Sequence, residues 1–388
     1  GSARIMVDFD AFLHERSTQG LGRKLRAAET RHDGRVAYHG CDYVDFSSND
    51  YLGLSNHPRL IRAAIEATQT FGVSASGSRL MSGNLRLHQT LEEKIAEFKN
   101  KPAALFFNSG YQANVGIVAA ICGKGDAIFS DRLNHASLID GMKLSDAEFF
   151  RFRHNDPEHL ESLLKKHRKN FADVLIATET VFSMDGDRAP LEAMVELKEK
   201  YHCRLLVDEA HATGLFGPAG SGMVEELNLS ERVDFIMGTF SKAMGSFGAY
   251  LASSHTAIEY LINACRSFIY STALPPGVVA ANIEAIDLVR EEPQCRQKVL
   301  QNAQWFRNQL RHAGLKVKGD TQIVPAVLGD NHKTLAAAQK LQQKGYWVTP
   351  VRPPTVPPGQ ACLRFSITFA HERSTLEKVI HDLHDCAI

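Results

Sequence analysis

The sequence has no net charge and lacks long apolar runs. Lys plus Arg and Asp plus Glu number 44 each among 388 residues, so no global attraction to nucleic acid or to an anionic membrane surface is expected. No apolar stretch approaches the roughly 20 residues that span a bilayer, and the N-terminus has no signal-peptide core. We therefore expect a cytoplasmic protein without nucleic-acid or membrane partners, in which any anionic ligand is held by a local arrangement of groups.

Cysteine is scarce, and its spacing forms no recognisable site. The seven cysteines are scattered and include no C-x-x-C pair, which suits reduced thiols in a cytosol-like compartment and gives no reason to expect a metal site. Internal repeats and low-complexity segments are also absent. A chain of this length and ordinary composition predicts one large domain plus a smaller one, with a substantial buried core.

Short apolar runs alternate with helical patterns through the middle of the chain. Such runs are typical of strands that are buried on both faces of a parallel sheet. The alternation predicts an α/β domain with a mostly parallel sheet flanked by helices, whose site lies in loops at the C-terminal ends of the strands. The runs are Ala104 to Phe107, Ala127 to Phe129, Val174 to Ala177, Leu205 to Val207 and Phe235 to Met237.

The pattern changes near residue 276, where long helical stretches lead into a few strand-like segments. We predict an N-terminal arm over residues 3–45, a large α/β domain over 46–275 and a smaller α+β domain over 276–388. The arm has helix-like apolar spacing, interrupted at Gly20 and Gly22, and basic residues that suit an anion. A solvated basic face explains those charges equally well.

One lysine lies between two strand-like segments. Lys242 follows the apolar run that ends at Met237 and precedes a run of small and apolar residues from Gly245 to Ala252. Burying an ammonium without a partner is costly, so a lysine in such a place is often there for its amine. Held as an imine with an aldehyde, it becomes a covalent handle for pyridoxal phosphate. Taken alone, a solvated loop lysine is the alternative.

Three other strand ends carry groups that suit the same cofactor. Gly110 and its small neighbours open a helix, where backbone N–H groups can face a phosphate, although a plain turn and cap is the alternative. His135 can stack on a flat ring, or serve as a capping or surface histidine. Asp208 ends an apolar strand, where a protonated pyridine nitrogen would be its partner; a metal pair or a helix start is also open. The order of these groups along the chain favours pyridoxal phosphate.

Longer segments resemble the α-oxoamine synthases, and the similarity covers the chain from about residue 20 to the end. These pyridoxal-phosphate enzymes have the fold of aspartate aminotransferase (fold type I) and join an amino acid to an acyl thioester with loss of carbon dioxide. The segments are FSSNDYLGL (46–54), GSRLMSGN (77–84), SGYQAN (109–114), NHAS (134–137), VFSMDGD (181–187), DEAHATG (208–214), GTFSKAMG (238–245) and STALPP (271–276).

The resemblance implies a role for each matching residue. Lys242 would form the Schiff base and move protons at the amino-acid Cα, and Asp208 would pair with the pyridine nitrogen. His135 would stack on the ring, and His211 would contact the phenolic oxygen. Phosphate contacts are implied for Ser109, Gly110, Tyr111, Thr239 and, across a dimer interface, Thr272; substrate contacts are implied for Asn49, Ser183 and Arg364 at the carboxylate and for Arg23 and Thr355 at the acyl chain.

RPPTVPPG (352–359) followed by LRFSITFAH (363–371) is most similar to the family member of the biotin pathway. This similarity implies L-alanine and a pimeloyl thioester, carried by coenzyme A or by a carrier protein, as substrates of a homodimer with shared active sites. Sister enzymes remain open: 2-amino-3-ketobutyrate CoA ligase, serine palmitoyltransferase and 5-aminolevulinate synthase. An aminotransferase is a further alternative. A non-catalytic partner subunit is disfavoured because it would be expected to lack Lys242.

Overall fold

The computed structural model describes residues 7–385. The chain divides into two compact units. The large unit comprises residues 49–183 and 187–300, and the small unit comprises the described residues up to 48, residues 184–186 and those from 301 onward. The domain boundaries that we predict from the sequence stay a prediction. No helix within the described residues is both long enough and apolar enough to cross a bilayer.

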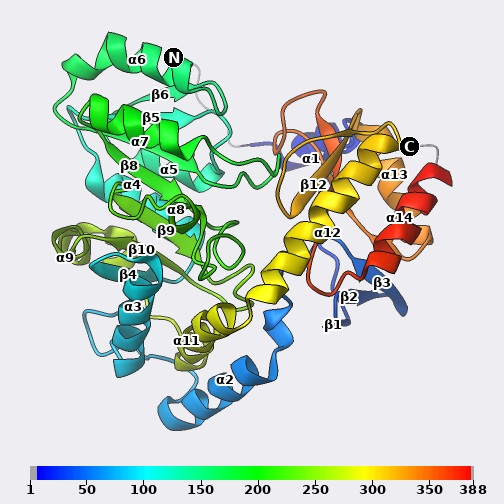
Figure 1. The fold of residues 1–388 in the computed structure, drawn as a ribbon, viewed down its shortest axis with the longest axis horizontal. Helices are drawn as coiled ribbons and strands as arrows, with labels where there is room; N and C mark the ends of the chain where they lie inside the picture. The colour runs from blue at the N-terminus through cyan, green and yellow to red at the C-terminus, as the bar shows by residue number, and fades with distance from the viewer. Residues whose placement is uncertain (1–6, 386–388) are drawn as a thin grey trace. The chain divides into compact units, whose positions relative to one another are not determined.

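A seven-stranded sheet forms the centre of the large unit (Figure 1), with the strand order β4-β10-β9-β8-β7-β5-β6. β10 is antiparallel to both its neighbours, while the pairs from β9 to β6 are parallel. The predicted mostly parallel sheet is therefore confirmed. The strands are β4 (Ala103–Phe107), β5 (Ala127–Asp131), β6 (Glu148–Phe152), β7 (Val174–Glu179), β8 (Arg204–Asp208), β9 (Phe235–Thr239) and β10 (Ala249–Ser253).

Helices cover this sheet because their apolar residues recur at helical spacing. α4 packs against α5, β4, β9 and β10. α6 packs against β6, and α7 packs against β8 (Figure 1). α6 begins as its sequence predicts, with Asp156 accepting from the backbone N–H of His159 and Pro157 in the first turn. The helices are α2 (Pro58–Phe71), α3 (Arg86–Lys99), α4 (Gly110–Ile121), α5 (Ala136–Leu144), α6 (Pro157–His167), α7 (Leu191–Lys200), α8 (Met223–Glu226), α9 (His255–Ala264), α10 (Arg266–Ile269) and α11 (Pro276–Glu291), with 3-10 turns η1 (Leu54–Asn56) and η2 (Arg168–Asn170).

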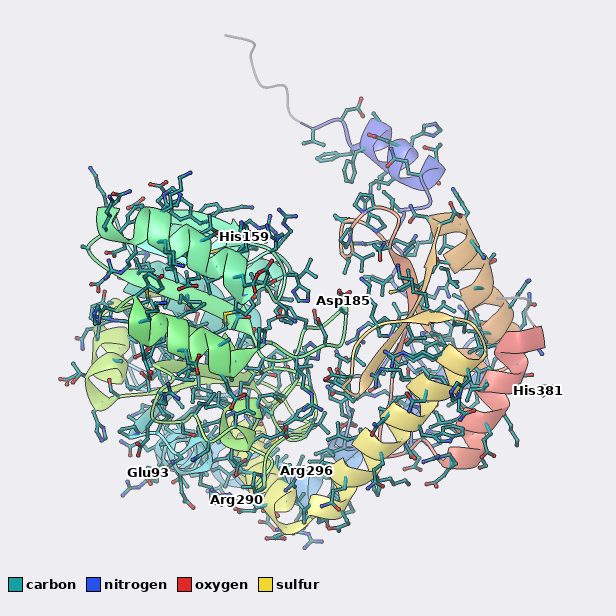
Figure 2. All side chains as sticks on the ribbon, turned by 45° about the horizontal axis from the view of Figure 1, so that its top comes forward. Glu93, His159, Asp185, Arg290, Arg296 and His381 are labelled. Atoms are coloured by element: carbon teal, nitrogen blue, oxygen red, sulfur yellow. The ribbon has the colours of Figure 1, made fainter. Side chains whose placement is uncertain are left out.

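A buried arginine near the end of the large unit fixes the segment that follows the Asp208 strand. Arg296, labelled in Figure 2, lies on α12 (Pro293–His312), which continues past the division between the units. Its guanidinium donates to the carbonyl oxygens of Val289, at 2.8 Å, and of Pro218. Burial lowers the pKa of Arg296 from its ordinary value, and the two carbonyl acceptors offset part of the desolvation cost.

The small unit contains two four-stranded sheets. Phe46, Phe306 and Phe365 pack together in its core, with ring centroids 5.2–6.4 Å apart. α1 (Phe9–Thr18) has no buried residue. The sheets have the orders β1-β2-β3-β13 and β11-β12-β15-β14, formed by β1 (Thr30–His32), β2 (Arg35–Tyr38), β3 (Cys41–Asp45), β11 (Lys316–Val317), β12 (Ile323–Gly329), β13 (Tyr346–Trp347), β14 (Thr349–Val351) and β15 (Ala361–Ser366), beside α13 (Asn331–Gln343) and α14 (Arg373–Asp385). The predicted smaller α+β part is confirmed.

Candidate active site

Polar side chains gather where the parallel strands of the large unit end. β7, β8 and β9 end at Glu179, Asp208 and Thr239. Glu179 lies opposite Asp208 in the register, and Asp208 lies opposite Met237. Because the carboxyl ends of parallel strands share one edge of a sheet, residues far apart in the sequence meet there. This edge is the candidate active site.

Asp208 is oriented by two donors. Its side chain is buried, with the backbone N–H of Ala210 donating to Oδ1 at 2.8 Å and Asn114 Nδ2 donating to Oδ2 at 2.9 Å. The same Asn114 amide group donates to Ser137 Oγ at 3.0 Å, and Ser137 Oγ lies 2.7 Å from His135 Nδ1. A carboxylate, an amide, a hydroxyl and an imidazole therefore form one connected network, which fixes Asp208 and His135 relative to each other.

His135 is neutral at ordinary pH. Burial lowers the pKa of its imidazole, and the positive charge of Lys242 lowers it further, against an opposing effect of Asp208. The backbone N–H of Ser137 donates to Nδ1 at 3.2 Å, so His135 also caps α5. A neutral ring whose Nδ1 accepts a hydrogen bond carries its proton on Nε2. The stacking role implied for His135 stays a prediction.

Glu179 is a second carboxyl group at the same edge, and the sequence reasoning gave it no role. It is fully buried, and burial together with the charge of Asp208 raises its pKa well above the ordinary value. Its Oε2 has no hydrogen-bond partner among the residues that the structure describes. Burial and the neighbouring charge therefore favour the protonated form of Glu179 beside Asp208.

His211 is held by a tyrosine that belongs to the motif at residues 46–54. The Tyr51 hydroxyl lies 2.8 Å from His211 Nδ1 and 3.2 Å from Asn49 Oδ1. Tyr51 and His211 are both buried. The structure thus brings Asn49 and His211, two residues with implied roles in the site, to the same phenol group.

The N-terminus of α4 provides a site for a phosphate. Ser109 caps the helix by accepting from the N–H of Gln112 at 3.1 Å, and the first-turn N–H groups of a helix favour an anion. The Thr239 hydroxyl is buried and has no partner among the described residues. A Cβ at Gly110 would lie 2.8 Å from Thr239 Cγ2, so the approach requires glycine. These donors fit the phosphate of pyridoxal phosphate.

The remaining implied phosphate ligands lie around this helix end. Tyr111 is exposed, donates to the Asp140 carboxylate and meets the His135 ring edge-to-face at 6.2 Å. Thr272 forms an isolated antiparallel β-bridge with Ser78, and its carbonyl oxygen accepts a hydrogen bond from Asn108 Nδ2 at 2.7 Å. The structure thus gives Thr272 backbone contacts within its own chain, and its reach across a dimer interface stays a prediction.

Lys242 lies in the tight connection between β9 and β10. The N–H of Gly245 donates to the Lys242 carbonyl at 2.9 Å, and Phe240 N–H donates to the Gly248 carbonyl at 2.8 Å. Gly245 has φ +67°, and a Cβ there would lie 2.5 Å from the Leu54 carbonyl carbon, so this turn requires glycine. The ammonium lowers the pKa of both His135 and Glu179, which places its charge at the strand edge.

The other implied substrate residues belong to the small unit. Arg364 lies on β15, is buried and donates to Ser366 Oγ at 2.8 Å. Arg23 Nη2 donates to Thr355 Oγ1 at 3.4 Å, so the two residues predicted to meet the acyl chain lie together. Arg352 donates to the carbonyl oxygens of Gly20 and Gly22 and attaches this part of the arm to the loop after β14.

Sequence reasoning missed Asn114, Ser137, Tyr51 and Glu179 as supports of the site. Asn114, Ser137 and Tyr51 fall inside segments already quoted for their resemblance, and that position was the available signal. Their partners become evident only when strand order and helix orientation are known. Glu179 gave a weaker signal: it is an acidic residue at the end of an apolar strand.

Comparison with known proteins identifies the family of this chain. The family model described as "Aminotransferase class I and II" matches residues 41–383. The 8-amino-7-oxononanoate synthases of Geobacter sulfurreducens and Citrifermentans bemidjiense are each 47% identical to this chain. The match covers 95% of this chain and of the Geobacter protein, and 96% of this chain and of the Citrifermentans protein.

Solved structures show the same fold. A serine palmitoyltransferase from S. paucimobilis with bound PLP and myriocin superimposes with TM-score 0.94 at 32% identity, covering 99% of this chain and 98% of that one. An 8-amino-7-oxononanoate synthase from Francisella tularensis superimposes with TM-score 0.77 at 29% identity, covering 88% and 97%. The chain therefore belongs to the class I and II aminotransferase family of pyridoxal-phosphate enzymes and, within it, to the α-oxoamine synthases.

Proposed function

We propose that the protein condenses L-alanine with a pimeloyl thioester to form 8-amino-7-oxononanoate, carbon dioxide and the free thiol of the carrier. The observation that carries this proposal is the 47% identity, over 95% of both chains, to a protein named for that product. Asp208, His135 and Lys242 at one sheet edge support it, because this chemistry needs a carbanion at the amino-acid Cα. Pyridoxal phosphate, when bound, supplies the electron sink for that carbanion.

Different residues of the large unit would contact different parts of the cofactor. Asp208, already fixed by Asn114, would accept from the protonated ring nitrogen, and His135 would stack on the ring. His211 would contact the phenolic oxygen, and Ser183 would also contact the cofactor. Ser109, Gly110, Tyr111 and Thr239 would hold the phosphate, joined by Thr272 of a second chain.

Lys242 is the proton carrier in this proposal. Its amine would hold the cofactor covalently, and it would remove the Cα proton of the amino acid and later return it. Asn49, Ser183 and Arg364 would orient the amino-acid carboxylate, for which the planar guanidinium of Arg364 offers a two-pronged contact. The neutral ring of His135 adds no charge that would compete with the protonation of the cofactor.

Three arginines of the small unit form a candidate site for the far end of the acyl chain. Burial lowers the pKa of Arg352, and the positive charges of Arg23 and Arg16 lower it further. Within residues 7–385 these three groups donate to carbonyl and hydroxyl oxygens only, and none is paired with a carboxylate. Crowded cations without a counter-ion favour an anion. We propose that the terminal carboxylate of the pimeloyl chain binds there.

Replacing Arg23 by glutamine is expected to raise KM for pimeloyl-CoA about tenfold or more, because a hydrogen bond between charged groups contributes roughly 1.5–3 kcal/mol. Heptanoyl-CoA lacks the terminal carboxylate, so its KM should stay within about twofold of the wild-type value. Steady-state kinetics with both thioesters measures the difference, with Lys24→Gln as the matched control on the arm. An equal rise in KM for both thioesters would show that Arg23 does not bind the terminal carboxylate.

We also propose that the active enzyme is a homodimer with shared active sites. Large apolar side chains are exposed in and after α2 and beside the Lys242 loop: Ile61, Ile65, Phe71, Val73, Leu80, Met81 and Phe247. A hollow of about 410 Å³, lined partly by Leu60, Val73 and Gly245, lies in the same region. An exposed apolar surface of this kind favours a protein interface.

Sedimentation velocity at micromolar concentration is expected to give twice the mass of one chain. The variant Ile65→Asp/Val73→Asp should shift the protein towards the single-chain mass, because it places charge on the apolar surface. A matched change on an exposed polar surface, Glu66→Gln, should leave the mass unchanged. A wild-type protein that sediments as one chain would refute the shared-site proposal.

The reaction itself is tested by thiol release. Purified protein reconstituted with pyridoxal phosphate should release thiol from pimeloyl-CoA only when L-alanine is present, with 8-amino-7-oxononanoate identified by mass spectrometry. The sister reactions provide the controls: L-serine with palmitoyl-CoA, glycine with acetyl-CoA and glycine with succinyl-CoA. A higher kcat/KM for any of these pairs than for alanine with pimeloyl-CoA would reassign the substrate.

A further inference from the structure

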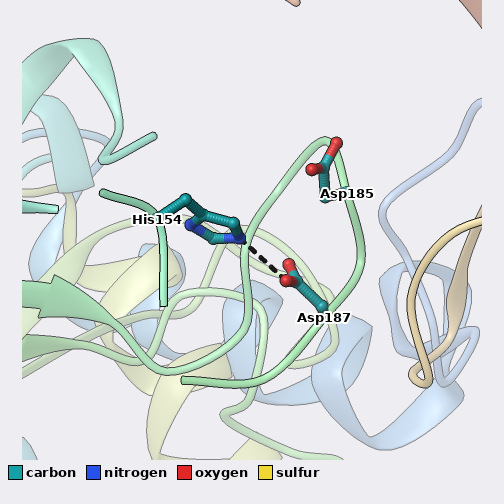
Figure 3. A group of neighbouring side chains, drawn as sticks. All are labelled: His154, Asp185 and Asp187. Carbon is teal, nitrogen blue, oxygen red and sulfur yellow. Dashed lines mark hydrogen bonds and ion pairs between the residues drawn. The ribbon is translucent and has the colours of Figure 1, made fainter. Parts of the chain in front are cut away.

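His154 lies between two carboxylates outside the site described above. It follows β6 and is half-buried; Nδ1 lies 2.9 Å from Asp131 Oδ1, and Nε2 lies 2.8 Å from Asp187 Oδ2. Figure 3 shows the contact between His154 and Asp187. Because carboxylates accept and do not donate, each ring nitrogen must carry a proton to form both hydrogen bonds. The geometry therefore requires an imidazolium.

The charge of this group agrees with its contacts. Hydrogen bonds and charge from Asp131 and Asp187 raise the pKa of His154 to about 10, against the opposing effect of burial. Asn155 completes the arrangement: its N–H donates to Asp131 Oδ2 at 2.8 Å, and its Nδ2 donates to Asp187 Oδ2 at 3.0 Å and to the Arg188 carbonyl at 3.0 Å. His154 is thus positively charged throughout the neutral range.

Asp187 stands at the base of the loop that carries Ser183. The N–H of Phe182 donates to the Asp187 carbonyl at 3.0 Å, and the N–H of Ala189 donates to the Thr180 carbonyl at 3.0 Å. Phe182, directly before Ser183, also meets the His154 ring edge-to-face at 4.4 Å. The imidazolium and its neighbours therefore fix both sides of the loop base to the end of β5, where Asp131 lies.

We propose that His154 is a positioning residue that holds the base of the 181–188 loop, so that the Ser183 hydroxyl stays in place for the amino-acid substrate. This inference rests on the proposed function only for the role of Ser183. A neutral amide cannot donate to two carboxylates on opposite sides, as the imidazolium does. Without His154, Asp131 and Asp187 would face each other as like charges, of which Asp131 is fully buried.

Hydrogen exchange of the wild-type protein and His154→Gln tests the structural part without any substrate. Protection of the backbone amides in residues 180–188 is expected to fall about tenfold or more in His154→Gln, because local opening becomes easier. His167→Gln, the same substitution at a half-buried histidine of the neighbouring α6, should leave this peptide unchanged. Asp187→Asn removes one of the two carboxylates and provides a second variant if His154→Gln does not fold.

The charge adds a pH signature. The charged groups that face His154 are Asp131 from β5 and Asp187 and Asp185 from the loop, with Asn155 as a neutral neighbour; Asp131 and Asp187 form the hydrogen bonds. Because the folded pKa of about 10 exceeds the ordinary 6.5, the stabilisation by His154 is complete below pH 6.5, declines as the pH rises, and is lost above about pH 10. The difference in unfolding midpoint between the wild type and His154→Gln should narrow across that range.

A double-mutant cycle with Ser183→Ala tests the link to the substrate. The affinity for L-alanine, titrated through the cofactor absorbance, is expected to fall about tenfold in His154→Gln and to fall no further when Ser183→Ala is added. Additive losses, or unchanged protection and unchanged affinity in His154→Gln, would overturn the inference. A wild-type protein that does not respond to alanine would instead refute the proposed function and leave the exchange result to decide the role of His154 in the loop.

Discussion

Replacing Lys242 by alanine is expected to abolish thiol release, with a loss of about 10⁴-fold or more, the upper range for a positioned acid–base group. The variant loses both the covalent attachment of the cofactor and the amine that moves the Cα proton. The other cofactor contacts, above all the fixed Asp208 carboxylate and the N-terminus of α4, remain in place. Pyridoxal phosphate should therefore still bind to the variant, but without a covalent link.

Borohydride reduction followed by mass spectrometry separates these two effects. The wild-type chain should gain the mass of the reduced cofactor on Lys242, and Lys242→Ala should gain none. Lys165→Ala, which changes an exposed lysine on α6, should match the wild type in both mass and activity. Residual turnover above a hundredth of the wild-type rate in Lys242→Ala would assign the proton transfer to another group.

The second large effect is expected from Lys99, which forms a buried ion pair with Glu209, the residue that follows Asp208. Lys99 Nζ is 2.8 Å from Glu209 Oε2, and both side chains are almost completely inaccessible to solvent. It also donates to the Ser221 carbonyl. Lys99→Met should lower the free energy of unfolding by about 3–5 kcal/mol, because it leaves the Glu209 carboxylate buried without its cationic partner, although the backbone N–H of Val224 still donates to Oε1. Urea denaturation measures the loss.

Two comparisons make this expectation specific. Lys99→Met/Glu209→Gln removes the stranded charge as well, so it should recover part of the lost stability. Lys200→Met breaks an exposed pair with Glu161 on the surface and should change stability little. Equal losses for Lys99→Met and Lys200→Met would show that burial of the pair does not determine its contribution.

In the seven-stranded sheet, the apolar pattern of the sequence predicted the strands that are buried on both faces. It missed β6, which is mostly exposed. β4, β5, β7, β8 and β9 appear in the sequence as unbroken apolar runs. β6 pairs only with β5 at the sheet edge, and of its residues only Phe152 is buried. Its charged residues interrupt the apolar pattern, so the edge strand gave no signal of that kind.

The sequence also could not predict whether the apolar residues of the N-terminal arm are buried. Helical spacing predicted an amphipathic segment, and α1 forms within it, but Phe9, Phe12 and Leu13 are exposed in the single chain. Periodicity identifies an apolar stripe without identifying what covers it.

Some residues of the candidate site could be predicted from the local sequence, and others could not. Strand-end chemistry is local, so Asp208 and Lys242 stood out from their neighbours in the sequence. The network from Asp208 through Asn114 and Ser137 depends on where α4 and α5 pack, and Glu179 gains its meaning only from its position opposite Asp208. Sequence-local patterns cannot supply strand order, and that order determines which polar groups meet.

The antiparallel β10 has a consequence for the order in which the protein assembles during synthesis. Ala249 of β10 lies opposite Phe107 of β4 on one side and Thr239 of β9 on the other. A growing chain that ends before residue 249 has the α4 N-terminus and Asp208, but it lacks the strand that joins β4 to β9. Such distant pairing forms late and slowly. The sheet whose edge carries the candidate site is therefore complete only after β10 has been synthesised.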